Sequence, residues 1–289
     1  IPVCTVWNSH DILTNDSEYY GGRPGADGER SGNFNMQNAD LLIIMGARMH
    51  VRQVGFDEKS WARDAKKIMI DIDKPELDIP NLNIDLKINM DLTVFFNEFS
   101  KLQKKFNINN HKHNEYLKWC QKNVKELSVM QKHHFKSKNQ TINPYLFVST
   151  LFDNLHHNAN IITADGTAAV VTFKVAKLKK NQRLFTNKGC ASMGFDLPAL
   201  IGSLYADSKC EREHILIAGD GSIMMNLQEL DSLKPFLKKN IKIYILNNEG
   251  YHSIRQSQAN YFDGFEVGCG EKSNLFMPDF NKIAKAFNL

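Results

Sequence analysis

The sequence has no apolar run long enough to cross a bilayer, and its first residues lack the basic start and small-residue cleavage site of a secretory signal. Cysteine pairing is also missing, because the five cysteines form no CxxC pair; they are Cys4, Cys120, Cys190, Cys210 and Cys269. This pattern is typical of reduced thiols in a cytosolic protein. The histidine pairs at 133–134 and 156–157 lack the spacing of metal ligands. We therefore expect a cytoplasmic protein with no membrane partner and no histidine-based metal site.

A strong excess of one charge is absent as well. The 36 lysines and arginines exceed the 32 aspartates and glutamates by only four, and the lysines are spread along the chain. A solvated surface explains this distribution better than a nucleic-acid-binding face, so we expect no nucleic-acid partner. The length of 289 residues leaves room for two domains, each with its own core.

The stretch 215–258 carries the clearest structural pattern. An apolar run at 215–218 stops at a Gly-Asp-Gly turn, an amphipathic segment continues to about Lys238, and a second apolar run at 241–246 stops at two asparagines. This pattern predicts a βαβ unit, whose right-handed crossover makes the strands parallel. Both strands then end at one edge of a sheet, where ligands of open α/β sheets bind.

Strand and helix patterns alternate through the rest of the chain. We expect further strands at 1–7, 41–45, 67–72 and 160–163, a helix at 115–130, and a helix that begins after the N-cap Asn143 with Pro144 in its first turn. The predicted fold class is α/β, with two doubly wound, mostly parallel-sheet domains. The predicted boundaries are 1–97 for the first domain, 98–141 for a helical linker and 142–289 for the second domain.

The two turns of the βαβ unit offer ligands for a hard cation. Asp220 supplies a carboxylate oxygen, Asn248 an amide oxygen and Gly250 a backbone carbonyl, a set that suits Mg²⁺ completed by phosphate oxygens. Gly221 and Ser222 begin a helix, where free N–H groups favour a phosphate. The alternative is that both are ordinary turns, which are common in α/β proteins.

Gly-Asp-Gly at 219–221, followed by 25 residues (222–246) and then Asn-Asn, resembles the thiamine diphosphate motif of pyruvate decarboxylases, acetolactate synthases and transketolases. The resemblance implies Mg²⁺ bound by Asp220, Asn248 and the Gly250 carbonyl. It also implies contacts between thiamine diphosphate and neighbouring residues of the two turns, namely Gly219, Gly221, Ser222 and Tyr251.

The segment GCASMGFDLP at 189–198 resembles the family segment that binds the aminopyrimidine ring and bends the cofactor. Met193 matches the bulky apolar position between the two rings, and its thioether suits an aromatic face. The carbonyl of Ala191 or of its neighbour Ser192 would accept a hydrogen bond from the ring amino group. Without the neighbouring match, a core methionine would be the preferred interpretation of Met193. Gly166 and Thr167 are further candidates for the diphosphate.

In the first domain, the loop 20–33 is rich in glycine but does not form a GxGxxG fingerprint. The strand 41–45 ends in Gly46-Ala47-Arg48, and Arg48 could meet a phosphate, a flavin diphosphate or a nearby carboxylate. The region resembles the middle domain of acetolactate synthase-like enzymes, where this turn lies beside FAD. Gly46 and Arg48 are therefore candidate FAD contacts, although several relatives keep the domain without a flavin.

The resemblance implies decarboxylation of a 2-oxo acid such as pyruvate and transfer of the two-carbon unit to a carbonyl acceptor. In this superfamily an activating glutamate comes from a pyrimidine-binding domain of a neighbouring subunit in a homodimer or homotetramer. We find no such domain here, and expect a fragment that lacks both the N-terminal domain and the C-terminal end and has little turnover alone. The alternative is a non-catalytic thiamine diphosphate-binding fragment or subunit.

The segment EGYHSIRQSQ at 249–258 bears on the acceptor. Acetolactate synthases resemble it closely but have tryptophan where Ser257 stands, so a larger and more polar acceptor is plausible. The nearest resemblance is to proteins of surface-sugar pathways, which implies a keto sugar nucleotide. Arg255 and Gln256 are candidate substrate contacts or, alternatively, a pair on a helix surface.

Overall fold

A computed structural model describes residues 1–103, 105, 111–136, 141–207, 209 and 211–289. Cys210 and parts of the predicted linker 98–141 lie outside the described residues. The chain divides into two compact units, Ile1–Gln131 and Lys132–Leu289. The boundaries predicted from the sequence stay predictions.

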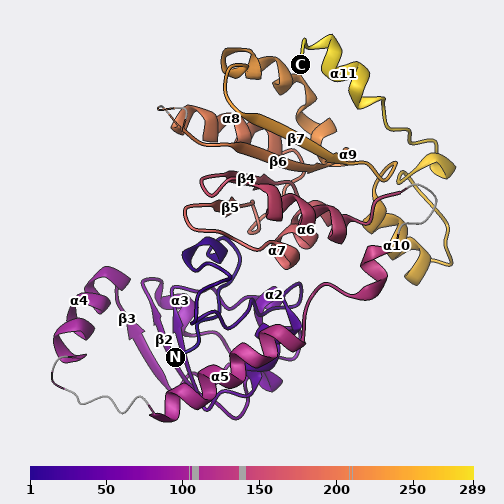
Figure 1. Cartoon of the computed structure of the whole chain (residues 1–289). Helices are drawn as coiled ribbons and strands as arrows, with labels where there is room; N and C mark the ends of the chain where they lie inside the picture. The colour runs from indigo at the N-terminus through magenta and orange to yellow at the C-terminus, as the bar shows by residue number, and fades with distance from the viewer. Residues whose placement is uncertain (104, 106–110, 137–140, 208, 210) are drawn as a thin grey trace. The chain divides into compact units, whose positions relative to one another are not determined.

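The first unit contains a parallel sheet whose described strands follow the order β1-β2-β3 (Figure 1). These strands are β1 (Leu41–Met45), β2 (Lys66–Asp71) and β3 (Leu86–Asn89). Ile43 pairs with Ile68, and Ile70 pairs with Ile88. The apolar runs of β1 and β2 confirm two of the predicted strands, whereas β3 has a half-polar sequence, LKIN, and was not expected.

Helices and 3₁₀ turns connect and flank these strands. They are η1 (His10–Ile12), α1 (Arg30–Gln37), α2 (Val51–Val54), η2 (Glu58–Ser60), α3 (Lys74–Leu77), α4 (Leu92–Gln103) and α5 (His111–Glu126). Helix α5 lies in the segment expected to connect the domains, and it packs on α1. The Tyr116 hydroxyl donates to the Asn35 carbonyl at 2.6 Å, and Asn123 Nδ2 donates to Asn35 Oδ1 at 2.7 Å.

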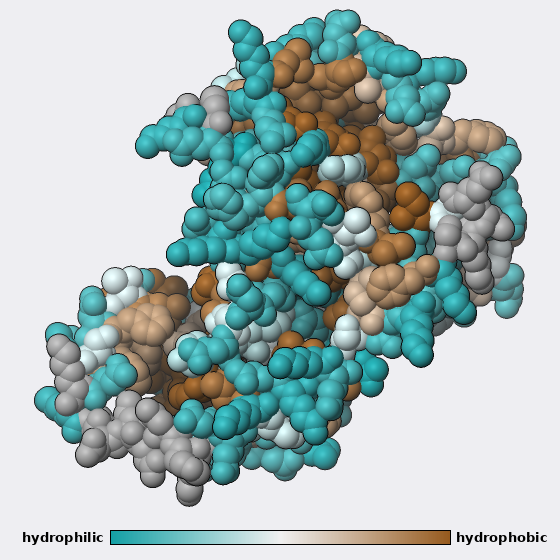
Figure 2. Space-filling model, viewed as in Figure 1, coloured by the Kyte–Doolittle hydropathy of each residue, from teal (hydrophilic) through white to brown (hydrophobic). Residues whose placement is uncertain are grey.

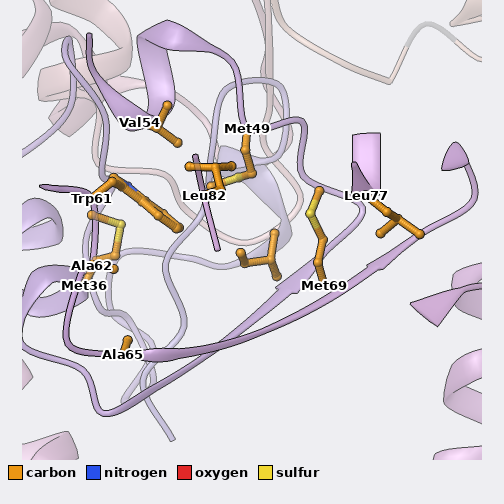
Figure 3. Packing of buried hydrophobic residues seen from close by; sticks show 10 residues of the cluster. Met36, Met49, Val54, Trp61, Ala62, Ala65, Met69, Leu77 and Leu82 are labelled. Atoms are coloured by element: carbon orange, nitrogen blue, oxygen red, sulfur yellow. The ribbon is translucent and has the colours of Figure 1, made fainter. Parts of the chain in front are cut away.

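The core of the first unit lies beside this sheet (Figure 3). Trp61 is 3% exposed, and Met69 on β2 is fully buried. The remaining buried members of the cluster are Met36, Ile44, Met49, Val54, Ala62, Ala65, Leu77 and Leu82. In Figure 3, Met36 lies close to Trp61, and a flexible methionine side chain suits the irregular space of such a core.

The strand predicted at 1–7 is wrong. The segment forms only an isolated bridge between Val3 and Tyr20, in which Val3 N donates to the Tyr19 carbonyl at 2.7 Å and Gly21 N donates to the Val3 carbonyl at 2.8 Å. The β-branched residues favour an extended backbone, but here that backbone pairs with a loop instead of a strand, so no ladder develops.

The second unit contains a parallel sheet with the described strand order β5-β4-β6-β7, which rises in this order through the upper part of Figure 1. The strands are β4 (Asn160–Thr163), β5 (Arg183–Phe185), β6 (His214–Gly219) and β7 (Ile241–Leu246). Leu216 at the centre of β6 pairs with Ile162 and Ile243. Strands β4, β6 and β7 were predicted. The three-residue β5 was not, because it is too short to show a period.

Strand β6 is covered on both faces, since five consecutive residues, 214–218, are buried and successive side chains point to opposite sides. The helices that precede it are α6 (Pro144–Asn154), α7 (Thr167–Val175) and α8 (Asp196–Ala206). Helix α6 begins as predicted, because Asn143 Oδ1 accepts a hydrogen bond from Tyr145 N at 2.9 Å. The structure thus has the predicted α/β architecture.

The crossover between β6 and β7 differs from the expected regular helix. It contains a short helix, α9 (Asp220–Ile223), and then 3₁₀ turns, η4 (Met224–Phe236), with a break at Asn226. The other helical segments are η3 (Lys132–Phe135), α10 (His252–Tyr261), η5 (Glu271–Ser273) and α11 (Phe280–Ala286). Four helical residues give a much smaller dipole than the predicted helix to Lys238 would have given.

An apolar groove of about 740 Å³ lies among η4, β7 and α11, and most of its lining side chains are leucine and isoleucine. In Figure 2, hydrophobic side chains gather in the same upper part of the second unit. Within the described residues, no helix combines the length and apolar character that a membrane span requires.

Candidate functional site

The carboxyl ends of β4, β6 and β7 lie side by side, because these neighbouring strands are parallel. Gly166 and Thr167 follow β4, Asp220 follows β6, and Asn248 comes two residues after β7. The topology therefore gathers the three strand-end turns that the sequence singled out.

Asp220 connects two of these turns. Asp220 is only 2% exposed. Oδ1 accepts a hydrogen bond from Gly221 N at 2.8 Å, and Oδ2 accepts from Asn248 N at 3.1 Å and Gly250 N at 2.9 Å. One carboxylate thus fixes the turn after β6 to the turn after β7.

The turn after β7 has an unusual backbone. Glu249 has φ 62°, and Gly250 has φ 131°, values that side-chain-bearing residues rarely adopt. A Cβ at Gly250 would lie 2.3 Å from the Cys269 carbonyl oxygen. The same carbonyl accepts a hydrogen bond from Tyr251 N at 2.9 Å. This turn therefore depends on glycine at 250 and on support from the later segment around Cys269.

Tyr251 packs on the start of α9. A Cβ added to Gly221 would lie 2.3 Å from Cε1 of the Tyr251 ring. The space left by the missing side chain at Gly221 is therefore filled by Tyr251. Packing gives a sufficient reason for glycine at 221, whereas the sequence predicted a phosphate beside the free N–H groups of this helix start.

The candidate substrate residues lie on α10 in different environments. Arg255 turns back toward the Asn248 turn, where its Nη2 donates to the Asn248 carbonyl at 2.5 Å and lies 3.3 Å from Asn248 Oδ1. Gln256 and Ser257 are exposed. Only Arg255 is thus brought to the candidate metal turn.

The loop 189–195 approaches the same region from β5. Met193 is 39% exposed, so it is not the core methionine of the alternative hypothesis. Ala191 has φ 53°, and its N–H donates to the Asn187 carbonyl at 2.7 Å. A non-glycine residue in this conformation is often found at a functional site. Together with Ser192, Met193 lines a cavity of about 490 Å³, whose other lining residues are Asn187, Gly194, Phe195, Pro198, Ala199 and Asn226.

Asp196 is an ionisable residue of this region that the sequence did not single out. It is fully buried at the start of α8. Its Oδ1 accepts from Leu197 N at 3.0 Å, whereas Oδ2 has no hydrogen-bond partner. Burial raises the pKa of this carboxyl; the Leu197 N–H and the nearby Ser222 hydroxyl oppose the rise, although no hydrogen bond of normal geometry joins Ser222 to Oδ2.

Two further contributors were also missed. Asn226 Nδ2 donates a hydrogen bond to the Gly194 carbonyl, and the Cys269 carbonyl accepts one from Tyr251 N directly beside Gly250. The local sequence contained a weak indication of Asn226, because asparagine is unfavourable in the interior of the helix that was predicted there. Cys269 had none, because its contribution comes from the backbone.

The candidate flavin residues lie in the first unit. Gly46 follows β1, and its N–H donates to the Ile70 carbonyl at 2.9 Å. Arg48 Nε lies 3.0 Å from Glu76 Oε1, and its side chain is 73% exposed. Glu76 is thus the nearby carboxylate that was one of the expected partners of Arg48.

The donor chemistry around Asp220 suits a hard divalent cation. Among the described residues, no group of three His, Cys, Asp or Glu side chains is arranged to bind a metal. A cation here would use one carboxylate and neutral oxygens from Asn248 and Gly250. It would require further oxygen ligands with negative charge, such as those of a phosphate.

Comparison with protein families agrees with this division of the chain. Residues 1–99 match the thiamine pyrophosphate enzyme central domain, and residues 165–289 match the thiamine pyrophosphate enzyme C-terminal binding domain. The two matches correspond to the parts that contain the parallel sheets, apart from β4, which precedes the second match.

Curated relatives align with nearly all of the chain. It is 31% identical to a probable acetolactate synthase large subunit of Methanococcus aeolicus and 30% identical to an acetolactate synthase large subunit of Porphyra purpurea, each over 100% of the chain. It is 29% identical to the acetolactate synthase isozyme 1 large subunit of Escherichia coli over 93% of the chain. The chain spans about half the length of these relatives, at 48%, 47% and 45% respectively.

Proposed function

The chain belongs to the thiamine pyrophosphate enzymes, because it contains their central domain and their C-terminal binding domain. We propose that its second unit binds thiamine diphosphate with Mg²⁺. The protein ligands of the ion are Asp220, the Asn248 side-chain oxygen and the Gly250 carbonyl. The hydrogen bonds from both turns to the Asp220 carboxylate are the observation that carries this proposal.

The residues present fit this group. A single buried carboxylate is a strong ligand, because its attraction to a cation is screened less than at the surface. The positive φ values of Glu249 and Gly250 define a sharp turn, which keeps the Gly250 N–H on Asp220. The phosphate oxygens would balance the remaining charge of Mg²⁺.

When bound, thiamine diphosphate would supply the electron sink for decarboxylation of a 2-oxo acid and transfer of a two-carbon unit to a carbonyl acceptor. The chain's own residues bind and orient it. Five residues at the ends of β4 and β6 would contact the diphosphate, namely Gly166, Thr167, Gly219, Gly221 and Ser222.

Met193 is exposed in the loop 189–195, and its thioether would pack against the face of a cofactor ring. The Ala191 carbonyl, or that of Ser192, would accept the hydrogen bond of the ring amino group. The Tyr251 ring packs against Gly221 and so connects the start of α9 with the turn that follows β7.

The donor substrate in this proposal is pyruvate or a similar 2-oxo acid, in line with the acetolactate synthases that the chain is similar to. The acceptor is a carbonyl compound, with a keto sugar nucleotide as the candidate. Gln256 and Ser257 support a polar acceptor, because they are polar residues exposed on α10, the helix that also carries Arg255. Arg255, beside Asn248, would favour an anionic ligand.

FAD is proposed only for the first unit, at Gly46 and Arg48. A flavin diphosphate would compete there with Glu76 for the guanidinium. Flavin absorbance in the purified wild type that disappears in Arg48→Ala would support this site, and wild-type protein that binds no added FAD would exclude it.

Calorimetry tests the central proposal. Thiamine diphosphate should bind the wild type only when Mg²⁺ is present, and Asp220→Ala should abolish binding. Asp231→Asn is the matched control, because this exposed residue pairs with Lys234 on η4, away from the turn. Absence of binding to wild type, or equal binding to Asp220→Ala, would refute the proposal.

Product analysis by mass spectrometry then tests the reaction. The chain is combined with a pyrimidine-binding domain and supplied with pyruvate and candidate acceptors. Acetolactate as the sole product would contradict the keto sugar acceptor. Cofactor binding without turnover in this mixture would favour the alternative, a non-catalytic binding subunit.

A further inference from the structure

The peptide groups of Gly194 are bonded to the α9–η4 segment on both sides. Gly194 N donates to Ser222 Oγ at 2.9 Å, and the Gly194 carbonyl accepts from Asn226 Nδ2 at 2.7 Å. Ser222 lies on α9, two residues after Asp220, and Gly194 directly follows Met193. The loop that carries Met193 is thus fastened to the segment that begins with Asp220.

The fit at Gly194 is close. Its φ is 82°, and an added Cβ would lie 2.7 Å from the Met225 Cβ and 2.8 Å from Asn226 Nδ2. Glycine is required here both by conformation and by space. The loop therefore lies directly on η4 at the residue after Met193.

Asn226 stands at the break in the crossover, where its φ of −135° and ψ of 37° leave the helical region. Asparagine amides readily leave a helix to bond other backbone groups. Ser222 Oγ accepts one hydrogen bond from Gly194 and retains its own hydrogen as a donor. Both residues can thus hold Gly194 without using the Asp220 carboxylate.

We propose that Asn226 is a positioning residue which, with Ser222, holds the Met193 loop at a fixed place relative to the Asp220 turn. This inference rests on the proposed function. Asp220 belongs to the half of the site that binds metal and diphosphate, and Met193 to the half that binds the rings. Asn226 joins the two halves, so that binding of the diphosphate presents the rings to a loop already in place.

Two probes separate this role from general support of the fold. Magnesium pyrophosphate occupies only the diphosphate half, whereas magnesium thiamine diphosphate occupies both. In calorimetry, Asn226→Ala should weaken thiamine diphosphate about tenfold, equal to about 1.4 kcal/mol, and leave the pyrophosphate affinity within about twofold. Asn226→Asp should be weaker still, because a carboxylate would face the Gly194 carbonyl. Asp231→Asn should match the wild type with both probes.

A ligand-free measurement makes the inference independent of catalysis. In hydrogen exchange, Asn226→Ala should expose amides of 189–195 to faster exchange and leave 214–219 of β6 protected. If Asn226→Ala bound both probes more weakly by the same factor, Asn226 would only support the fold. If it bound both probes as tightly as the wild type, Asn226 would have no positioning role. Either result would overturn the inference. If the wild type binds neither probe, the proposed function itself fails.

Discussion

Asp220 should stabilise the protein before any ligand binds, and Asp220→Asn tests this. The carboxylate accepts three backbone hydrogen bonds with donor–acceptor distances of 2.8, 3.1 and 2.9 Å. Hydrogen bonds to a charged group contribute about 1.5–3 kcal/mol each. An asparagine has one acceptor oxygen, so at least one of the three donors would face an amide NH₂ group, and the remaining bonds would lose their charge.

We therefore expect Asp220→Asn to lower the free energy of unfolding by about 2–4 kcal/mol. For a folding unit of this size, that change would lower the melting temperature by about 5–10 °C. The measurement is scanning calorimetry in a chelating buffer, with Asp231→Asn as the control. The control should change stability by less than about 0.5 kcal/mol, because an exposed ion pair contributes little. A variant as stable as wild type without Mg²⁺ would refute the role given to the three hydrogen bonds.

Gly250→Ala should abolish Mg²⁺-dependent thiamine diphosphate binding in calorimetry, because its Cβ would lie 2.3 Å from the Cys269 carbonyl at a φ of 131°; unchanged binding would contradict this geometry. Asp196→Asn should raise the free energy of unfolding at pH 7 by about 1 kcal/mol. Burial raises the pKa of Asp196, so the charged carboxylate destabilises the wild type at pH 7 and the neutral carboxyl does not. The stability gained by Asp196→Asn should therefore vanish when urea unfolding is measured near pH 3–4, where the wild-type carboxyl is neutral as well. Burial lowers the pKa of His214 although Asp207 opposes the shift, so wild-type stability should fall as pH drops below about 6.5. His214→Asn should flatten this dependence, and an unchanged slope would be the contrary result.

The parts of the fold that could be predicted from the sequence are those encoded by local pattern. Strands β1 and β7 match their predicted limits, because each is an apolar run closed by turn residues. Strands β3 and β5 are short and partly exposed, so their sequences show neither a run nor a clear alternation. The segment 1–7 has strand-like residues, but its pairing was decided by a distant loop.

The residues of the candidate site also differ in whether the local sequence indicates them. Asp220 and Asn248 could be singled out because each lies in the turn that follows a strand of one βαβ unit. Asp196 could not, since its raised pKa results from burial, which the sequence of the segment does not reveal. The support of Gly250 by Cys269 depends on how the chain folds back after α10, and no residue type marks that contact.

The contact of Ser222 and Asn226 with Gly194 is only partly encoded by the local sequence. The two residues are four apart in a segment with many apolar residues, a spacing at which side chains on helical turns share one face. Ser222 is 4% exposed, and a buried hydroxyl requires a hydrogen-bond partner. The burial of Ser222, which the sequence does not show, requires a polar group beside α9. Only the structure identifies that partner as the peptide of Gly194, because the positive φ of this glycine brings both its N–H and its carbonyl within reach of the pair.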